Sequence, residues 1–517
     1  MPRWGMVVDL LKCVGCQTCT LACKQANNTP RGILWRWVAD CELGSYPNVS
    51  RVFLPMGCQH CANPPCLEVC PTTATYQRPD GIVDIHYERC IGCGYCVVAC
   101  PYLARSITLE AKPYYDTGLT PPEALGAWRD RLGVCTKCNF CLPRIEQGLA
   151  AGLRPGIDPD ASPVCVSSCI ANALHFGDLD DPESIVARYI RENATARLSE
   201  ELGTDPRVYY VVERGAADSE QLPGPANGSR PARLMQPRRQ QVWKWPAVAN
   251  FVLGGMGAAA YLISMLVWPA GPLTLVAPAL VAAGLLAVAI EAGRPARAFN
   301  LFRHLRRSWM SREALAATVF LLAAVWDWFM PHLAMRGLAG AAALAFMLCQ
   351  GFIVYRARAV IVWNSRIMPV LFLTSDFSGG SGLTLVLAAA VGRQGLVGAQ
   401  LLRFAVGAAV LNSAVWMAYL ASRDRISRKA VAGLCRPAAL ALVEDAGHAL
   451  PVLLLILALA AGWSAPTQSL TAAFAGALLV FGSAAQKIGV VRVAGFLRPI
   501  TLALLGRPRA HHSMEAL

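Results

Sequence analysis

The sequence predicts an α+β domain followed by an all-α membrane domain of about eight transmembrane helices. Three observations predict this order. Of the 20 cysteines, 18 lie before residue 170, where apolar runs are short. From residue 246 onward, apolar stretches of about 20 residues recur, which is the length that crosses a bilayer. The chain of 517 residues is 55% hydrophobic and only 15% charged, whereas soluble domains are about a quarter charged.

The first domain is expected to span residues 1–213. It has many Pro and Gly residues and ends in a helical stretch over 182–201 and a strand over 208–212. Residues 214–242 are rich in Gly, Pro, Ala and Ser and have no apolar period, which predicts a linker. The start of the chain has no apolar run before the first cysteines, so we expect no cleavable signal there.

The second domain is expected to span residues 243–510. Eight apolar runs with few charges between them favour membrane spans over the fully buried helices of a large soluble bundle. The fifth run is the weakest because Ser375, Asp376 and Ser378 interrupt it. The expected spans are 246–268, 272–290, 314–331, 337–355, 371–392, 401–421, 447–463 and 469–486.

The formal net charge of +14 divides unevenly and reports topology. Residues 1–229 carry a net charge of −5 and residues 230–517 carry +19. The loops and termini on one side of the expected spans hold 24 Lys and Arg residues, and the loops on the other side hold three. This count assigns Lys487 to the C-terminal tail. Because basic loops stay cytoplasmic, we expect a multi-pass inner-membrane protein with both termini and the cysteine-rich domain in the cytoplasm. The negative charge of that domain argues against nucleic-acid binding.

Sixteen cysteines form four groups. The third group is C-x2-C-x2-C-x3-C-P, the run in which bacterial ferredoxins hold one [4Fe–4S] cluster with three thiolates and a second cluster with the fourth. Zinc ribbons use separated C-x2-C pairs, and disulfides need an oxidising compartment. We therefore predict a ferredoxin-like domain of two di-cluster modules with four [4Fe–4S] clusters. The expected ligands are Cys13, Cys16, Cys19, Cys23, Cys58, Cys61, Cys66, Cys70, Cys90, Cys93, Cys96, Cys100, Cys138, Cys141, Cys165 and Cys169.

Four cysteines remain outside these groups. Cys135 lies three residues before Cys138 and is the alternative to Cys141 in a shifted fourth group; Cys141 is preferred. We expect Cys41, Cys349 and Cys435 to be small buried hydrophobic residues. His60, inside the second group, is expected to donate a hydrogen bond to cluster sulfur rather than to bind iron.

Several runs resemble the four-cluster iron–sulfur subunit of DMSO reductase-type molybdoenzymes. They are the segments 59–72, 80–83, 90–96 and 176–179, whose sequences are QHCANPPCLEVCPT, DGIV, CIGCGYC and FGDL. Residues 243–510 resemble the membrane anchor of the same enzymes, through the segments 293–295, 308–313 and 362–364 (GRP, SWMSRE and VWN). The chain thus resembles a natural fusion of two subunits.

The resemblance implies which cysteines share a cluster. Cys13, Cys16 and Cys19 would pair with Cys169, and Cys23 would join Cys138, Cys141 and Cys165. Cys58, Cys61 and Cys66 would take Cys100, and Cys90, Cys93 and Cys96 would take Cys70. The chain departs from the family pattern in the longer gap between Cys141 and Cys165 and in Ile170, where relatives have proline.

The membrane half offers no paired histidines within its spans and no C-x-x-C-H motif, so we expect no haem. Electrons would then enter or leave through a quinone that diffuses in the membrane. The family anchor is likewise a haem-free quinol site. The expected quinone-site residues lie near the clusters and are Glu291, Arg294, His304, Glu313, Trp363 and Asn364.

The resemblance also implies a separate molybdopterin-containing catalytic subunit, with this chain as its non-catalytic electron-transfer subunit. The cytoplasmic placement favours sulfite oxidation over reduction of DMSO, thiosulfate or polysulfide, because the similar sulfite dehydrogenases face inward. A redox-driven ion translocator is the alternative. It requires acidic residues across the bilayer, and only Asp327 and Asp376 lie away from the span edges.

Overall fold

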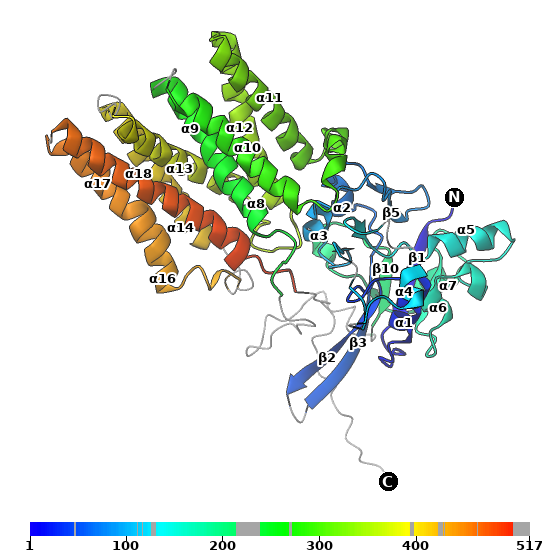
Figure 1. The fold of residues 1–517 in the computed structure, drawn as a ribbon. Coiled ribbons are helices and arrows are strands. Elements are labelled where there is room, and N and C mark those ends of the chain that lie inside the picture. Colours follow the sequence, from blue (N-terminus) through cyan, green and yellow to red (C-terminus); the bar gives the residue numbers. More distant parts are fainter. Residues whose placement is uncertain are drawn as a thin grey trace.

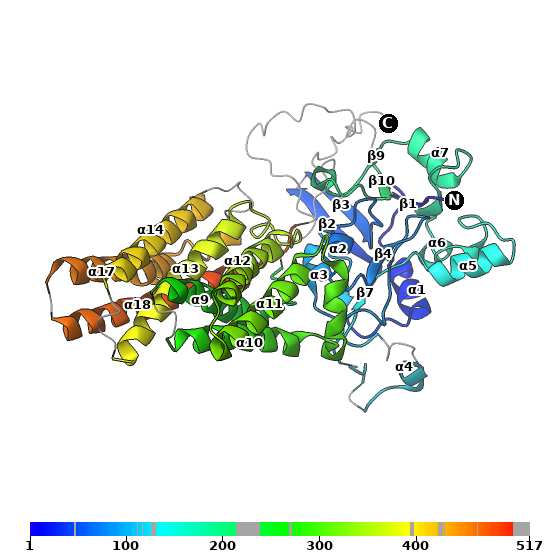
Figure 2. The ribbon, with the colours of Figure 1, turned by 90° about the horizontal axis from the view of Figure 1, so that it is seen from above.

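The computed structural model has two parts, a globular N-terminal domain and a bundle of long helices beside it (Figures 1 and 2). The structure describes residues 1–45, 48–110, 112–115, 117–125, 131–212, 238–267, 271–392, 398–421, 428, 430–462 and 464–499. Most of the predicted linker, residues 214–237, lies outside the described residues.

A four-stranded sheet joins the two ends of the N-terminal domain. The strand order is β8 (Leu174–Asp178), β1 (Trp4–Asp9), β10 (Val208–Val211) and β9 (Thr195–Ala196). Strand β1 is antiparallel to β8 and parallel to β10, and all six of its residues are buried. Buried in this way on both faces, β1 reads as a continuous apolar run rather than an alternating one.

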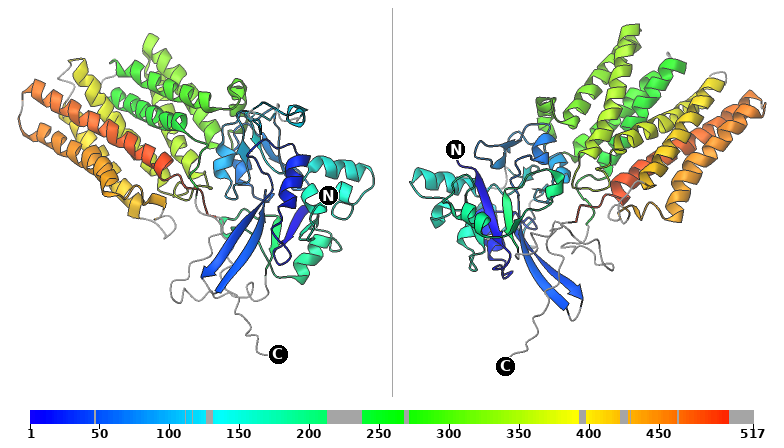
Figure 3. Two further views of the ribbon diagram at one scale, coloured as in Figure 1. Left: turned by 60° about the horizontal axis from the view of Figure 1, so that its bottom comes forward. Right: turned by 180° about the vertical axis from the view of Figure 1, so that it is seen from behind.

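Short helices and three two-stranded antiparallel sheets surround this sheet, and the β2–β3 hairpin projects from the domain (Figure 3). The strand pairs are β2 (Trp37–Ser45) with β3 (Asn48–Met56), β4 (Thr75–Gln77) with β5 (Val83–Ile85), and β6 (Ser106–Ile107) with β7 (Cys135–Thr136). The helices are α1 (Thr18–Ala26), α2 (Pro65–Glu68), α3 (Tyr95–Ala99), α4 (Pro121–Leu125), α5 (Leu142–Ala150), α6 (Val164–Ser167) and α7 (Ile185–Glu192), with short 3₁₀ turns η2 (Pro159–Ala161) and η3 (Glu200–Leu202).

Eight helices in the described part of the second domain are long and apolar enough to cross a membrane, as predicted. Large apolar side chains such as Leu266, Leu322 and Phe474 are exposed on the bundle, as contact with lipid requires. The spans are Trp245–Val267 (α8, Trp245–Ala249, then η4 and α9, Gly255–Val267), Leu273–Glu291 (α10), Trp309–Phe329 (α11), Leu333–Tyr355 (α12), Met368–Ala390 (α13), Ala399–Ala421 (α14), Pro437–Ala460 (α16, Pro437–Leu440, then η7 and α17, Leu450–Ala460) and Ala465–Val493 (α18, Ala465–Ile488, then η8).

Three of these spans contain π-helical segments. They are η4 (Asn250–Gly254), η7 (Ala441–Ala449) and η8 (Gly489–Val493), and each lies near the helix end that faces the N-terminal domain. A π-helical turn leaves backbone carbonyls available to side chains and often marks a functional site.

Backbone contacts hold the bundle against the N-terminal domain. The Arg294 N–H donates to the Ile91 carbonyl at 3.0 Å, and the Ala359 N–H donates to the Val98 carbonyl at 2.9 Å. At the same boundary, the 3₁₀ segment η5 (Pro295–His304) leads into α11. These contacts place α2 and α3 against the bundle, while α1 lies on the far side of the domain (Figure 1).

Three expectations fail in detail. The helix expected over 182–201 is shorter, since α7 ends at Glu192 and the chain then forms β9. Cys435 is exposed, although Cys41 and Cys349 are buried as expected. Lys487 is not a tail residue: it lies inside α18 and its side chain is 2% exposed. Charge counting missed this because a lysine near a span end resembles a topology signal.

Candidate metal centres and a membrane pocket

The structure brings the sixteen predicted cysteines together in four groups of four, which we call cages A to D. The thiols of a cage either line one cavity or lie within electrostatic range of one another. Cage A is Cys13, Cys16, Cys19 and Cys169; cage B is Cys23, Cys138, Cys141 and Cys165; cage C is Cys58, Cys61, Cys66 and Cys100; cage D is Cys70, Cys90, Cys93 and Cys96.

Local backbone geometry explains this exchange of cysteines between groups. Each tight loop is followed by a short helix, so the fourth cysteine lies one turn beyond the loop and belongs to the neighbouring cage. In the third group, Gly92 and Gly94 have φ of 71° and 74°, a left-handed conformation that turns the loop around its cavity. A Cβ on Gly92 would lie 2.1 Å from the Gly133 carbonyl oxygen, so no larger residue fits there.

Contacts to sulfur show that the cages suit iron–sulfur clusters. Backbone N–H groups donate to cysteine sulfur in three cages, from Cys135 to Cys90 at 3.4 Å, from Phe140 to Cys138 at 3.4 Å and from Ala173 to Cys169 at 3.2 Å. Such bonds stabilise thiolate ligands and tune cluster potentials. Among the described residues, no three Cys, His, Asp or Glu side chains converge tightly enough for a single metal ion.

The four cages follow one another through the domain. Cys96 of cage D lies within electrostatic range of Cys66 of cage C. Cys58 of cage C and Cys138 of cage B are likewise within electrostatic range of each other, as are Cys165 of cage B and Cys19 of cage A. The order D, C, B, A therefore leads from the bundle to the far side of the domain, and at that far end Cys16 is exposed.

Cys135 lies apart from the fourth cysteine group. It lines the cavity of cage D, where its thiol forms a hydrogen bond with Cys96. Cys141 instead stands with Cys23, Cys138 and Cys165 in cage B. The structure thus places Cys141 in cage B, as the preferred assignment of the fourth group expects, and places Cys135 in cage D.

His60, which we expect to donate to cluster sulfur, is fully buried inside the second cysteine group. Its Nδ1 accepts a hydrogen bond from the Val83 N–H at 3.1 Å, so the proton of the neutral ring is on Nε2. Burial lowers the pKa of His60 well below its usual value, and the Lys137 charge lowers it further, so the ring is neutral. Nε2 is buried with no partner among the described protein atoms and is available to a sulfide.

Three buried cations, Arg36, Lys137 and Arg105, stand between the cages. Burial lowers the pKa of the Arg36 guanidinium, but the thiolates of Cys165, Cys138 and others outweigh this and raise it, so Arg36 stays charged. Positive charge inside the domain offsets the negative charge of four-thiolate clusters and favours their reduced states.

Replacing Arg36 with methionine is expected to lower the reduction potentials of the clusters in cages A and B by about 50 to 100 mV. A cluster becomes more negative when it is reduced, so the nearby positive charge of Arg36 stabilises the reduced state. A unit charge close to a cluster contributes on the order of 1–2 kcal/mol to the free energy of reduction. Redox titration followed by EPR measures the shift. Arg51→Met on the exposed β2–β3 hairpin is the control, and equal shifts in both variants would refute a local effect of Arg36.

An apolar cavity of about 390 Å³ lies where the two domains meet. One wall is formed by Ile91 and Cys93 of cage D, and the others by α8, η4, α10, η5 and α11. This volume suits a small ligand of quinone size. Trp243 also lines the cavity, and its indole N–H donates to the Cys93 carbonyl at 3.2 Å.

Two carboxylates line this cavity, Glu313 and Glu291. Glu313 Oε1 accepts from the amides of Asn250 at 3.1 Å and Gln350 at 3.3 Å, and no described protein group binds its Oε2. Glu291 is occupied by the backbone, because its two oxygens accept the N–H groups of Lys244 at 2.7 Å and Ala247 at 3.1 Å. Glu313 is therefore the carboxylate available to a ligand, and Glu291 also caps α8.

The other four predicted residues do not line the cavity. Arg294 Nε donates to the Leu132 carbonyl at 2.9 Å, and His304 Nδ1 lies 2.8 Å from the Cys70 carbonyl, so both connect the domains. Trp363 stacks on Trp243 with 5.6 Å between ring centroids. Asn364 donates to the Tyr355 carbonyl at 3.0 Å. Sequence reasoning missed Asn250 and Gln350, since an amide within an apolar run was the only signal for either.

Glycine is required at position 293 by the contact between the domains. A Cβ there would lie 2.1 Å from the Gly133 carbonyl oxygen, a backbone atom that cannot move without shifting cage D. Gly293→Ala is expected to slow electron exchange between clusters and quinone at least several-fold while the iron content stays unchanged. Gly337→Ala is the control, since its Cβ meets nothing within 4 Å. Equal rates in the two variants would contradict the tight contact.

Comparisons with known protein families divide the chain in the same way. Two models described as a 4Fe-4S dicluster domain match residues 49–114 and 89–149. A model described as the DMSO reductase anchor subunit matches residues 241–483.

Curated relatives match the N-terminal domain. A selenate reductase subunit of Mesobacillus selenatarsenatis is 41% identical over 224 residues, which are 41% of this chain and 72% of the relative. A putative dimethyl sulfoxide reductase iron-sulfur subunit of Halobacterium salinarum is 42% identical over 41% of this chain and 79% of its own length. A sulfite dehydrogenase subunit of Allochromatium vinosum is 36% identical over 41% of this chain and 85% of its own.

Proposed function

Because the chain belongs to the iron–sulfur subunits of DMSO reductase-type molybdoenzymes, joined here to their membrane anchor, we propose that it connects a membrane quinone to a separate molybdopterin-containing catalytic subunit. It is a membrane-anchored electron-transfer subunit of an oxidoreductase complex. The carrying observation is the cavity that touches both Cys93 of cage D and Glu313, because a quinone there would meet a cluster and a proton-binding group at once.

Each cage would hold one [4Fe–4S] cluster, with its four cysteines as ligands. The clusters supply one-electron transfer at low potential. The protein fixes their order, surrounds them with Arg36, Arg105 and Lys137, and excludes water from most of their thiols. No haem is proposed. Quinone is the diffusible redox partner, and no chemistry other than quinone oxidation or reduction is assigned to this chain.

The catalytic subunit would dock at cage A, at the far end of the domain. Around this cage the apolar side chains of Leu11, Val14, Leu21 and Ile170 are 57%, 59%, 65% and 74% exposed. Exposed apolar side chains gathered at one place mark protein interfaces. Ile170, which departs from the family pattern, would thus contribute directly to this contact.

Ile170→Glu is expected to abolish co-purification of the molybdenum-containing partner and to leave the iron content and quinone reactivity of the chain unchanged. Molybdenum and iron assays of the purified material measure both. The control is Leu109→Glu. Leu109 is 57% exposed and lies in the same domain, whereas an exposed apolar residue on a span, such as Ile290, would face lipid. Retention of the partner by the Ile170 variant would place the docking surface elsewhere.

The cytoplasmic orientation proposed from the basic loops favours sulfite as the terminal substrate, with DMSO, thiosulfate and polysulfide as alternatives. The relatives include a sulfite dehydrogenase subunit and a more similar putative dimethyl sulfoxide reductase subunit, so the order of substrates rests on the proposed orientation. The test is mild extraction of the chain with its partners, followed by assay of molybdenum or tungsten and by EPR of the clusters after each substrate is added. We expect sulfite to reduce the clusters and quinone to reoxidise them. Absence of a pterin metal would overturn the proposed partner.

A further inference from the structure

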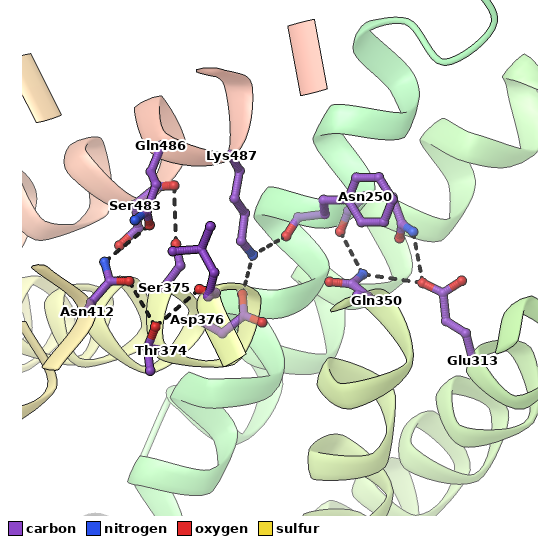
Figure 4. Close-up of polar contacts among 12 residues, drawn as sticks. Asn250, Glu313, Gln350, Thr374, Ser375, Asp376, Asn412, Ser483, Gln486 and Lys487 are labelled. Carbon is purple, nitrogen blue, oxygen red and sulfur yellow. Dashed lines mark hydrogen bonds and ion pairs between the residues drawn. The ribbon is translucent and has the colours of Figure 1, made fainter. Parts of the chain in front are cut away.

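A layer of polar side chains crosses the interior of the membrane bundle, at the depth of Glu313 (Figure 4). Its members come from several different spans, and all except the partly exposed Glu444 are buried. Because lipid and apolar side chains cannot satisfy polar groups, residues of this kind inside a membrane domain are retained for a function. The layer is formed by Asn250, Glu313, Gln350, Thr374, Ser375, Asp376, Asn412, Glu444, His448, Ser483, Gln486 and Lys487.

The centre of the layer is an ion pair between Lys487 of α18 and Asp376 of α13, whose side chains are 2% and 0% exposed. Gly255 makes room for the carboxylate, because a Cβ at this position would lie 1.9 Å from Asp376 Oδ1. A buried pair contributes little to stability compared with apolar residues of the same size, so folding alone does not account for it.

The pair lies directly behind the wall of the cavity. Lys487 Nζ donates to the Phe251 carbonyl at 2.5 Å, and Phe251 lines the cavity. The preceding carbonyl in η4, that of Asn250, accepts from Gln350 Nε2 at 3.1 Å, and the same amide group reaches Glu313. One π-helical turn therefore connects the ion pair with the carboxylate in the cavity.

On the other side, the layer continues toward the edge of the bundle. Asn412 of α14 accepts from Thr374 at 3.0 Å and donates to Gln486 at 3.2 Å, and its amide lies 2.7 Å from His448 Nε2. The neighbouring residue, Ser413, donates to Glu444 Oε2 at 2.7 Å. Glu444 is partly exposed and lies seven residues from Pro437, which is about 10 Å from the start of that span.

Several buried polar atoms of the layer have no protein partner among the described residues. They are Asn250 Oδ1, Gln350 Oε1, Asp376 Oδ2, Glu444 Oε1, Ser483 Oγ and Gln486 Nε2. Buried polar atoms in native proteins are almost always satisfied, and ordered water is the usual partner where protein atoms are absent. Water bound to these atoms would link the hydrogen-bonded pairs into a continuous chain.

We propose that this layer is a proton-conducting path between Glu313 in the quinone cavity and the aqueous phase on the cluster side. Protons enter or leave the path at Glu444, and the ion pair of Asp376 and Lys487 lies at its centre. The proposal rests on the proposed quinone site. Oxidation of one quinol releases two protons and two electrons; the electrons leave one at a time through the clusters, and the protons leave through this path. Reduction of a quinone reverses both flows.

The path stays in the half of the bilayer that faces the clusters. Asp376 lies eight residues from Met368, about 12 Å from the start of α13. Deeper in α13, Ser378 Oγ is buried without a partner among the described residues, two residues beyond Asp376, whereas the hydroxyls of Ser381 and Thr384 donate to carbonyls of their own helix and do not extend the layer. The proposed path therefore carries protons to the same side of the membrane as the clusters.

The test uses the full chain in detergent with its clusters reduced by dithionite and oxidised by a short-chain naphthoquinone. The double variant Asp376→Asn, Lys487→Gln removes both charges and keeps hydrogen-bonding groups. We expect the rate at saturating quinone to fall at least tenfold, the solvent deuterium isotope effect to rise, and azide, a small proton carrier, to restore part of the rate. The equilibrium dissociation constant of the quinone should change by less than about twofold.

His448→Gln tests the part of the layer between Asn412 and Glu444 without changing the buried ion pair. We expect cluster oxidation to slow in the same way and azide to restore part of the rate. The matched control is Asp327→Asn. Asp327 is a buried carboxylate paired with Arg336 at 2.9 Å, where α11 ends and α12 begins, away from the clusters. The rate of cluster oxidation in this variant should not change. Weaker quinone binding without an isotope effect or rescue would make the layer a structural support and overturn the path. If the unmodified chain neither binds nor reduces the quinone, the proposed quinone site itself fails.

Discussion

Replacing Glu313 with glutamine is expected to slow oxidation of the reduced clusters by quinone by about 10² to 10⁴-fold. Glutamine has the same shape, and its carbonyl oxygen can still accept from Asn250 and Gln350, so the wall of the cavity is preserved. What is lost is a group that can take and give a proton at the cavity, and loss of a positioned acid or base has effects of this size. Stopped-flow absorbance of the clusters measures the rate.

Glu291→Gln separates this role from that of the second carboxylate. The oxygens of Glu291 accept two backbone N–H groups at the start of α8, so its replacement should weaken that helix end and lower thermal stability, with a rate loss well below that of Glu313→Gln. A Glu291 variant as slow as the Glu313 variant, or a Glu313 variant at the normal rate, would contradict the assignment of Glu313 as the proton-exchanging group.

Replacing Cys141 with serine is expected to remove or convert one of the four clusters. Cys141 stands with three other thiols in cage B. A serine oxygen is a weaker ligand of cluster iron than a cysteine thiolate. Iron content should fall by between about one and four atoms per chain, and one EPR signal should disappear or change type. Since cage B lies between cages A and C, electron transfer between the proposed catalytic subunit and quinone should be abolished.

Cys135→Ser is the matched comparison, because Cys135 lies in cage D as a fifth thiol beside Cys96. We expect all four clusters to remain, with a shifted potential for the cluster of cage D, since the thiol that contacts Cys96 becomes a hydroxyl. Full iron content in the Cys141 variant together with cluster loss in the Cys135 variant would reverse the assignment that the spacing left open.

The domain order and the eight spans could be predicted from the sequence because both depend on strong local signals. Cysteine spacing is set by the cluster, and apolar length is set by the bilayer. Even the span interrupted by Asp376 was correctly predicted, since its total apolar length outweighs three polar residues. The partner of Asp376 could not be predicted, because Lys487 is 111 residues away in the chain and only packing of α13 on α18 brings them together.

The candidate site divides in the same way. Glu291 and Glu313 were predicted because they lie at span ends on the cluster side, and both line the cavity. Arg294 and His304 carry equally conspicuous polar groups, yet they bind carbonyls of the N-terminal domain, a use that only the docked structure reveals. Asn250 and Gln350 are uncharged, so nothing local separates them from amides that satisfy a helix interior.

The central claim is that electrons pass between the clusters and a quinone held in the cavity beside cage D. Its most direct test mixes the dithionite-reduced full chain, without any catalytic subunit, with a short-chain naphthoquinone and follows the cluster EPR signals by rapid freezing. The account predicts that all four clusters are reoxidised, and that Glu313→Gln slows this at least 100-fold without loss of iron. Clusters that stay reduced in the unmodified chain, or an equal rate in the variant, would contradict it.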